Sequence, residues 1–370
     1  FGKGQTYMAV LSAAQEKYVY SLIFNGVKLL CDILIVVVTI KFKTLESIAI
    51  VILAMKILEE IINRIVVKKK YPELHEIARK DTSMVKMTKD LAWTQLGYLI
   101  LNNVDALLLM GFNGPIMVSI YTTYNYILRF LTEIASRVEL SSVYSFGNVF
   151  AKKEEKRIYP LFKEYMMMFI LIAFSMCLTF MIGIRGFVSV WVGKENYILD
   201  YITIVLFTST SFLNILYLPL VALINADGLF KDNKKHIFIC ASVNLILSII
   251  LINYLGINGI LLGTGIAFLV NIALKSNLIS KKITKEIKLS NILKYYIITI
   301  ILFIVLSVAL KPIENYFLLT AGGFITTILK LGIIFIIITL LTSLILYVVS
   351  NDAKNLFRRL LNLIKRKLKK

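Results

Sequence analysis

Histidine and cysteine are rare in this sequence, with two and three copies in 370 residues. Cys31, Cys177 and Cys240 each stand alone within apolar runs, and His75 and His236 lie far apart in basic stretches. Because the sequence has no Cys-x-x-Cys pair, it offers neither a zinc knuckle nor a redox motif. Apolar packing is the expected role of the cysteines. We therefore expect no metal site and no cofactor.

A secretory signal peptide is also missing from the N-terminal segment. The segment lacks the order of basic start, apolar core and small-residue cleavage site. The first residue is Phe1 rather than Met. We expect the chain to be a fragment whose start lies upstream.

Apolar residues, in contrast, make up 58% of the chain and occur in long uninterrupted runs. Runs of about 20 such residues can cross a bilayer as helices, which excludes an ordinary soluble domain. The formal net charge is +20, but the basic residues lie between the apolar runs and in the tail FRRLLNLIKRKLKK. A positive bias beside membrane spans explains this charge without nucleic acid. The sequence thus predicts an all-α polytopic membrane protein.

Ten apolar windows predict about ten transmembrane helices. They cover residues 19–40, 46–67, 91–110, 115–140, 165–184, 199–224, 236–254, 257–278, 293–311 and 324–349. Lys and Arg gather in every second connection, whereas the others, such as MGFNGP and YLGING, are nearly uncharged. By the positive-inside rule, the basic connections and both chain ends are expected to be cytoplasmic.

Charged residues inside the predicted spans are the first candidates for function, because charge within a bilayer is costly. Arg129, Glu133 and Arg137 stand four residues apart, and each four-residue step along a helix drifts by only about 40°. The same plus, minus, plus spacing occurs in the window 46–67, at Lys56, Glu60 and Arg64.

The depth of each charge separates these candidates. At a rise of 1.5 Å per residue, Lys56 lies about 15 Å from the outer end of its helix, and Arg129 about 21 Å from Pro115. For these two, a cavity-lining role and an internal ion pair both stay open. Arg64 and Arg137 lie near the inner surface, where long side chains snorkel, so a structural role competes with a place at an entrance.

Four stretches, collinear over most of residues 1–280, resemble parts of a known family. They are LSAAQEKYVYSLI, LNNVDALLLMGFNGPIMVSIYTTYNYI, VSVWVGKENY, and the region from ALINADGLFKDN to LGINGILLGTGIA. They resemble, in order, the start of the fifth helix, the seventh-to-eighth helix hairpin, a short outer loop and the tenth-to-twelfth helix region of one family. That family is the polysaccharide flippases of the multidrug/oligosaccharidyl-lipid/polysaccharide exporter superfamily.

The resemblance implies a two-lobe, inverted V-shaped fold to which this chain contributes the fifth to the fourteenth helix. About four further helices are then expected upstream. The implied domains are the end of an N-terminal lobe (1–67), a cytoplasmic linker (68–90), a six-helix C-terminal lobe (91–284), two additional helices (285–350) and a basic cytoplasmic tail (351–370).

The resemblance also implies a function, the translocation of lipid-linked oligosaccharide or polysaccharide repeat units across the bacterial cytoplasmic membrane by alternating access. The implied substrate is linked to polyprenyl pyrophosphate, whose oxygens suit the fork-shaped donors of arginine. Candidate cavity residues are Arg129, Lys56, Glu133, Glu60, Asp105, Asn102, Tyr124 and Asn125, with Arg64 and Arg137 at the entrance. For Asp105, pairing between lobes, capping the hairpin and binding a coupling cation all stay open.

Three other functions also stay open. A cation-coupled antiporter of small molecules would need an acid-dominated cavity, whereas the unpaired charge within the spans is basic. A membrane-embedded glycosyltransferase or polymerase would need a sizeable outer loop or an acidic catalytic motif. Because no expected outer loop is that large, we expect no enzyme. A structural partner within a polysaccharide-assembly complex is the remaining alternative.

Overall fold

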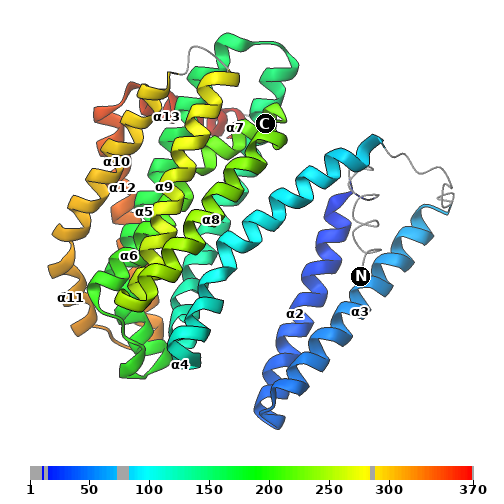
Figure 1. The fold of residues 1–370 in the computed structure, drawn as a ribbon, viewed down its shortest axis with the longest axis vertical. Coiled ribbons are helices and arrows are strands. Elements are labelled where there is room, and N and C mark those ends of the chain that lie inside the picture. Colours follow the sequence, from blue (N-terminus) through cyan, green and yellow to red (C-terminus); the bar gives the residue numbers. More distant parts are fainter. Residues whose placement is uncertain (1–10, 12–15, 73–82, 284–287, 369–370) are drawn as a thin grey trace. The chain divides into compact units, whose positions relative to one another are not determined.

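The structure is a computed structural model that describes residues 11, 16–72, 83–283 and 288–368, and within these residues every regular element is a helix (Figure 1). Residue contacts divide the chain into two compact units, Phe1–Thr82 and Ser83–Lys370. The boundary lies within the linker expected at 68–90.

The first unit is a hairpin of two helices, α2 (Lys17–Phe42) and α3 (Leu45–Lys70). Lys43 takes the left-handed conformation that ends α2, with a φ of 55°. The windows 19–40 and 46–67 are therefore helical, as predicted. Since α3 continues to Lys70, the expected linker begins as helix.

The second unit contains ten α-helices among its described residues. They are α4 (Ser83–Ala151), α5 (Ile158–Val192), α6 (Tyr201–Leu216), α7 (Leu218–Asp227), α8 (Phe230–Leu255), α9 (Ile257–Lys282), α10 (Leu289–Ala309), α11 (Lys311–Leu319), α12 (Phe324–Val349) and α13 (Asn351–Leu368). Two short 3₁₀ turns, η1 (Glu155–Arg157) and η2 (Glu195–Tyr197), lie on either side of α5. The basic segment expected as a tail is thus mostly helical, in α13.

Within the described residues, eight helical segments are long and apolar enough to cross a membrane. The chain is an all-α, multi-pass membrane protein. All ten predicted windows fall on helices, but 46–67 lies outside the eight segments and 91–110 overlaps one of them only from Asn103 onward. The window 46–67 lies in α3, which carries several charges, and 91–110 lies in the first half of α4.

Helix α4 reverses direction at Gly114, where φ is 80° and ψ is 177°. This backbone region is essentially restricted to glycine. Pro115 follows and begins the second half with no N–H to satisfy. Hydrogen bonds join the two halves, from Tyr121 to Asp105 (3.1 Å) and from Arg129 to Asn103 (3.1 Å). The predicted helices 91–110 and 115–140 therefore form a hairpin.

We expect Gly114→Ala to lower the stability of the second unit by about 1–3 kcal/mol, because alanine is strained at this φ and ψ. No atom lies within 4 Å of a Cβ placed at Gly114, so a steric clash does not contribute. Gly111→Ala is the matched control, since its added Cβ also meets nothing within 4 Å and its backbone is helical. Thermal unfolding of the purified protein in detergent measures both, and equal melting temperatures would contradict the strain.

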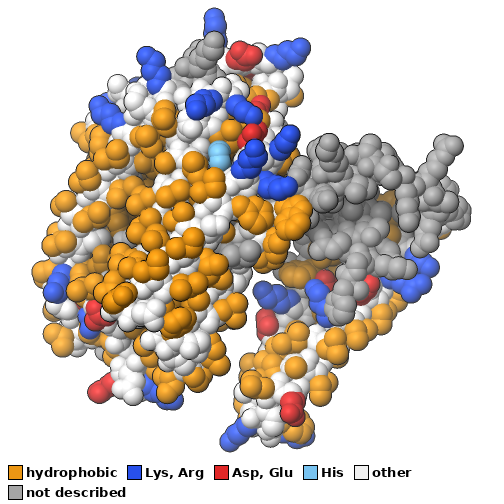
Figure 2. Space-filling model, viewed as in Figure 1, with side chains coloured by type: hydrophobic (Ala, Val, Ile, Leu, Met, Phe, Trp, Pro, Cys, Tyr) orange, Lys and Arg blue, Asp and Glu red, His pale blue; other side chains and the backbone are white. Residues whose placement is uncertain are grey.

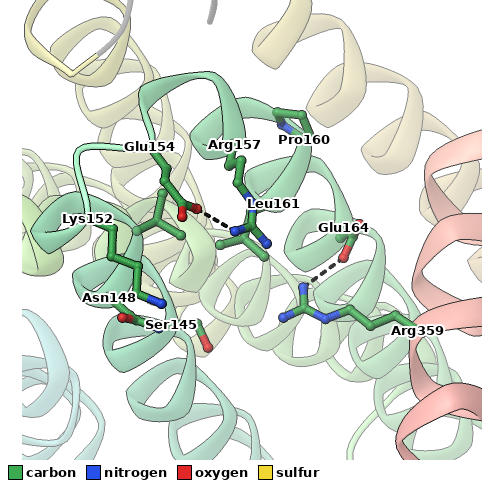
Figure 3. Close-up of a pocket in the computed structure, with 10 residues that line it drawn as sticks. Ser145, Asn148, Lys152, Glu154, Arg157, Pro160, Leu161, Glu164 and Arg359 are labelled. Carbon is green, nitrogen blue, oxygen red and sulfur yellow. Dashed lines mark hydrogen bonds and ion pairs between the residues drawn. The ribbon is translucent and has the colours of Figure 1, made fainter.

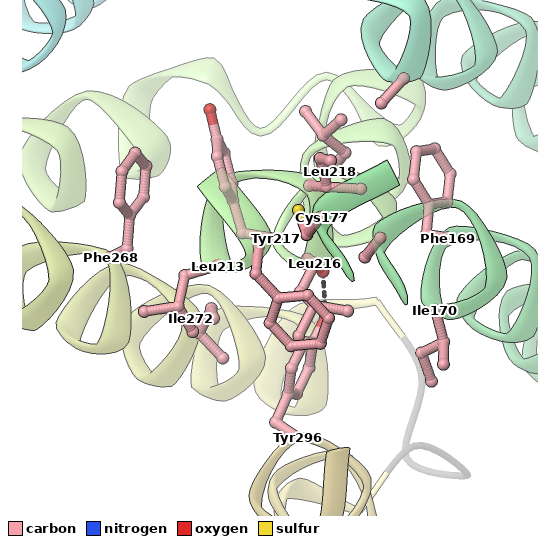
Figure 4. Packing of buried hydrophobic residues seen from close by; sticks show 14 of the residues in the cluster. Phe169, Ile170, Cys177, Leu213, Leu216, Tyr217, Leu218, Phe268, Ile272 and Tyr296 are labelled. Carbon is pink, nitrogen blue, oxygen red and sulfur yellow. Dashed lines mark hydrogen bonds between the residues drawn. The ribbon is translucent and has the colours of Figure 1, made fainter. Parts of the chain in front are cut away.

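Helix α5 forms the centre of the core and is largely buried. Figure 4 shows the packing near the break between α6 and α7, where Cys177 of α5, Leu216 and Tyr217 belong to one cluster of buried residues. The break follows from Pro219, which lacks the N–H that would continue the helix. The Tyr296 hydroxyl of α10 donates a hydrogen bond to the Leu216 carbonyl at 2.9 Å. A backbone acceptor inside the membrane is thereby satisfied, as the apolar surroundings require.

The outer surface of the second unit is apolar along its length. Large exposed Ile, Leu, Val and Phe side chains follow α10 and α12, and in α12 only Thr327 is buried. Figure 2 shows this apolar surface on α8 and α9, with Lys and Arg gathered mainly at the end where α8 begins and α9 ends. An apolar surface of this extent is what lipid-exposed helices require.

Candidate functional site

Asp105, in the first half of α4, is almost completely buried, with 4% of its surface exposed. It accepts hydrogen bonds from the Tyr121 hydroxyl at 3.1 Å and from the Thr264 hydroxyl at 3.1 and 3.3 Å. The Thr264 hydroxyl in turn accepts a bond from the Asn244 amide at 2.8 Å. Three helices, α4, α8 and α9, thus meet at one carboxyl group. A buried polar network of this kind is costly unless its members are paired.

The close packing of α8 on α9 holds Thr264 in this network. Gly263 precedes Thr264, and a Cβ added at Gly263 would lie 2.6 Å from the Ser248 Oγ of α8. The absence of a side chain lets the two helices approach closely. The tight turn at Gly256, where φ is 55°, makes α8 and α9 antiparallel neighbours.

A cavity of about 450 Å³ lies beside this network, inside the second unit. Both halves of α4 line it together with α6 and α9. Its polar lining residues are Asn103, Asp105, Tyr121, Asn125, Arg129, Thr132, Glu133, Thr210, Ser211, Asn214 and Thr264. Leu99, Leu128, Phe207, Leu261 and Phe268 complete the wall.

Four of the predicted cavity residues therefore line one cavity: Arg129, Glu133, Asp105 and Asn125. The Arg129 guanidinium donates a hydrogen bond to the Asn103 amide oxygen at 3.1 Å. Arg129 and Glu133 are both exposed in the second unit, whereas Asp105 lies deeper. The predicted Asn102 has a side chain outside the described part of the structure, and its neighbour Asn103 supplies the amide instead.

Tyr124, a further predicted cavity residue, is fully buried in the core and does not line the cavity. Its hydroxyl donates to the Tyr197 carbonyl at 2.9 Å and accepts from the Leu199 N–H at 3.1 Å. Its ring stacks on Phe207 at 5.9 Å. This geometry gives Tyr124 a structural role, fixing the loop between α5 and α6 against α4.

The charges predicted in α3 lie in the first unit. Lys56 forms an ion pair with Glu59 at 2.7 Å, three residues away. Glu59 also accepts a weak hydrogen bond of 3.5 Å from the Tyr20 hydroxyl of α2. Glu60 is half-buried and Arg64 is exposed.

Arg137, the last charge of the predicted ladder in α4, lines a different cavity from Arg129. This second cavity measures about 470 Å³ and is bounded by α4, α5 and α13. A third cavity, of about 210 Å³, adjoins it, because Ser145, Glu164 and Arg359 line both. Figure 3 shows the third cavity with its ion pairs, Arg157 with Glu154 and Arg359 with Glu164.

Sequence reasoning missed the contributions of α6 and α9 to the first cavity. Thr210, Ser211 and Asn214 belong to the run TSTSFLN, which is unusually polar for a membrane span. This polar run was the one feature of the sequence that could have indicated the contribution of α6 to the cavity. Thr264 and Phe268 had no comparable signal, because an isolated threonine or phenylalanine is ordinary in such a helix.

Fold and cavity together define the class of the protein, a multi-pass all-α membrane protein with a polar cavity among its helices. Within the described residues, no group of three or more His, Cys, Asp or Glu side chains could hold a metal ion. Comparison with protein-family models finds no match, and comparison with curated proteins finds none either.

Proposed function

We propose that this protein translocates lipid-linked oligosaccharide or polysaccharide repeat units across the bacterial cytoplasmic membrane by alternating access, and that it is not an enzyme. The lining of the 450 Å³ cavity supports this most, because neutral amides and hydroxyls outnumber charged groups in it. Such groups exchange hydrogen bonds with sugar hydroxyls. The Tyr121, Phe207 and Phe268 rings add apolar surface next to them. The volume falls in the range of about 300–1,000 Å³ of small-molecule sites.

Arg129 is the residue proposed to attract the pyrophosphate of the lipid carrier. It lies in the cavity wall, where a planar guanidinium can meet phosphate oxygens with two parallel donors. Glu133 stands one helical turn away in the same wall and moderates the positive field, so that binding stays reversible. The excess of Lys and Arg at the end formed by α13 and the start of α8 favours a cytoplasmic position for that end.

Transport of a lipid-linked sugar by the full-length protein in proteoliposomes tests this role. We expect Arg129→Ala to reduce the rate at least about tenfold, because a desolvated arginine–phosphate contact is lost. Arg129→Lys keeps the charge but loses the fork, and its rate should lie between those of the wild type and Arg129→Ala. Lys156→Ala is the matched control, since it removes an exposed cation of η1 that lines none of the three cavities.

The competing explanation is that Arg129 only stabilises the fold through Glu133 and Asn103. In that case Glu133→Gln should lower expression and melting temperature as much as Arg129→Ala does. A well-expressed Arg129→Ala protein with wild-type transport would refute the proposed role.

Export of a small cationic compound is a second candidate function, favoured by one specific observation. The cavity lining holds two carboxyl groups, Asp105 and Glu133, and one guanidinium, Arg129. This balance differs from the basic excess expected from the sequence. Uptake of a fluorescent organic cation by the same proteoliposomes distinguishes the two functions, because Glu133→Gln should abolish cation transport but only slow transport of the lipid-linked sugar.

A further inference from the structure

The 470 Å³ cavity next to Arg137 has an amphipathic wall that the proposed transport function does not use. Arg137, Arg359 and Glu164 supply charge, while Val138, Met168 and Leu356 supply apolar surface. The end of α4, the start of α5 and the first turns of α13 contribute these side chains. We call this cavity the α13 groove.

The helix that closes the α13 groove is firmly attached to the second unit. Asp352 accepts hydrogen bonds from the Lys163 ammonium at 2.8 Å and from the Tyr295 hydroxyl at 3.3 Å. Ala353 and Leu356 are buried, which anchors the same end of α13 by apolar packing. The α13 side of the groove is therefore held in place by the packing of the fold.

Cationic groups predominate around the α13 groove and the 210 Å³ cavity that adjoins it. The linings of the two cavities contain four cations, namely Arg137, Arg359, Lys152 and Arg157, and two carboxylates, namely Glu154 and Glu164. Arg359 pairs with Glu164 at 3.0 Å and Arg157 pairs with Glu154. Among the residues that the structure describes, no carboxylate lies within ion-pair distance of Arg137. The surplus charge is positive, which is complementary to an anion.

The position of the α13 groove along the membrane normal indicates which anion it would meet. Arg137 lies 22 residues after Pro115, where the second half of α4 begins, so it stands about 33 Å further along the helix. This distance is close to the hydrocarbon thickness of a bilayer, about 30 Å. With the turn at Gly114 and Pro115 placed at the opposite membrane surface, as the positive-inside rule predicts for an uncharged connection, Arg137 is at the level of the lipid phosphates on the side of α13, and the apolar surface of the groove extends towards the acyl chains.

We propose that the α13 groove binds an anionic phospholipid of the surrounding bilayer. Arg137 and Arg359 hold the phosphate, and an acyl chain lies along Val138, Met168 and Leu356. The polar 210 Å³ cavity, with Lys152 pointing into it in Figure 3, accommodates the rest of the headgroup. Helix α13 suits this position, because it is a basic amphipathic helix of the kind that lies at the membrane surface.

Native mass spectrometry of the full-length protein in detergent tests the site by titration with phosphatidylglycerol. Arg137→Gln should weaken phosphatidylglycerol binding by on the order of tenfold, since a charge-assisted phosphate contact is removed. Arg358→Gln is the matched control: Arg358 is the exposed neighbour of Arg359 on α13 and does not line the groove. It should stay within about twofold of the wild type, because an exposed charge outside the groove contributes little. The melting temperature of each variant checks that the fold is retained.

Two further probes identify the source of the anion. Phosphatidylcholine should bind at least about fivefold more weakly than phosphatidylglycerol, because its headgroup has no net charge to satisfy the surplus cations. Inorganic phosphate should not displace the bound lipid, because it lacks the acyl chain that the groove contacts. Displacement by inorganic phosphate would indicate a free-anion site and overturn the proposal. Equal losses in Arg137→Gln and Arg358→Gln would also overturn it, since they would indicate attraction to surface charge alone.

Because this proposal concerns a bilayer lipid, its failure is distinguishable from failure of the transport function. Transport is tested at Arg129, in a different cavity, and lipid binding at Arg137.

Discussion

Gly259→Ala should prevent the second unit from folding stably, because no room exists for even one methyl group. A Cβ at Gly259 would lie 2.3 Å from the Leu251 carbonyl oxygen and 2.5 Å from its carbon. Both atoms belong to the backbone of α8, so no side-chain rotation relieves the clash. The helices must separate, and overpacking that displaces backbone costs about 3 kcal/mol, the upper end of the usual range. Thr264 lies on the same helix, so separation would also loosen its bond to Asp105.

The measurement is the yield of monodisperse protein in detergent together with its melting temperature. Gly265→Ala is the matched control on the same helix, since the nearest atom to its added Cβ is Thr210 Cγ2 at 3.8 Å. This variant should be as stable as the wild type or slightly more so, by up to about 1 kcal/mol, because glycine is unfavourable within helices. A Gly259→Ala protein as stable as Gly265→Ala would show that α8 and α9 are not in close contact.

The helices themselves could be predicted from the sequence, because bilayer thickness fixes the length of an apolar run. Local chemistry also accounts for two interruptions. Pro219 removes an N–H, and the helix breaks at Tyr217, two residues earlier. Gly256 permits a positive φ, and it forms the tight turn between α8 and α9. Helix α11, which follows the predicted window 293–311, was not anticipated, since nine residues are too few for a span.

The distribution of the α4 charges between cavities could not be predicted from spacing. Arg129 and Arg137 are eight residues apart, which corresponds to a rotation of about 80° around the helix and a rise of about 12 Å. That difference is enough for each to face different neighbours, α6 and α9 for Arg129 and α5 and α13 for Arg137. The hydrogen bond between Asp105 and Thr264 could not be predicted from the sequence either, because the two residues are 159 positions apart.

Glu314→Leu is expected to be the other strongly destabilising change. The Glu314 carboxylate is fully buried and accepts two hydrogen bonds, of 3.1 and 3.2 Å, from the Arg185 guanidinium. This contact fixes α11 against α5, where Phe317 packs over Gly186. Removing the carboxylate leaves a largely buried guanidinium without its counter-charge, which costs about 3–5 kcal/mol. The melting temperature should fall by roughly 5–10 °C.

An exposed ion pair provides the control for this prediction. Asp232 and Lys282 are joined at 2.7 Å, with 32% and 48% of their side chains exposed. Asp232→Ala should change the stability by less than about 1 kcal/mol, because water screens the pair. The contrast with Glu314→Leu separates the effect of burial from that of removing a carboxylate.

Replacing both partners tests whether the buried Arg185–Glu314 pair adds net stability or only fixes the position of α11. Burial raises the pKa of Glu314 above its ordinary value, and Arg185 opposes this shift without cancelling it. For a buried pair, the cost of desolvating the two charges can exceed their mutual attraction. An Arg185→Met/Glu314→Leu protein should then regain most of the stability lost in Glu314→Leu, because well-packed apolar side chains can replace a buried ion pair at little cost. A double variant as unstable as Glu314→Leu would show that the carboxylate stabilises α11 through contacts other than Arg185.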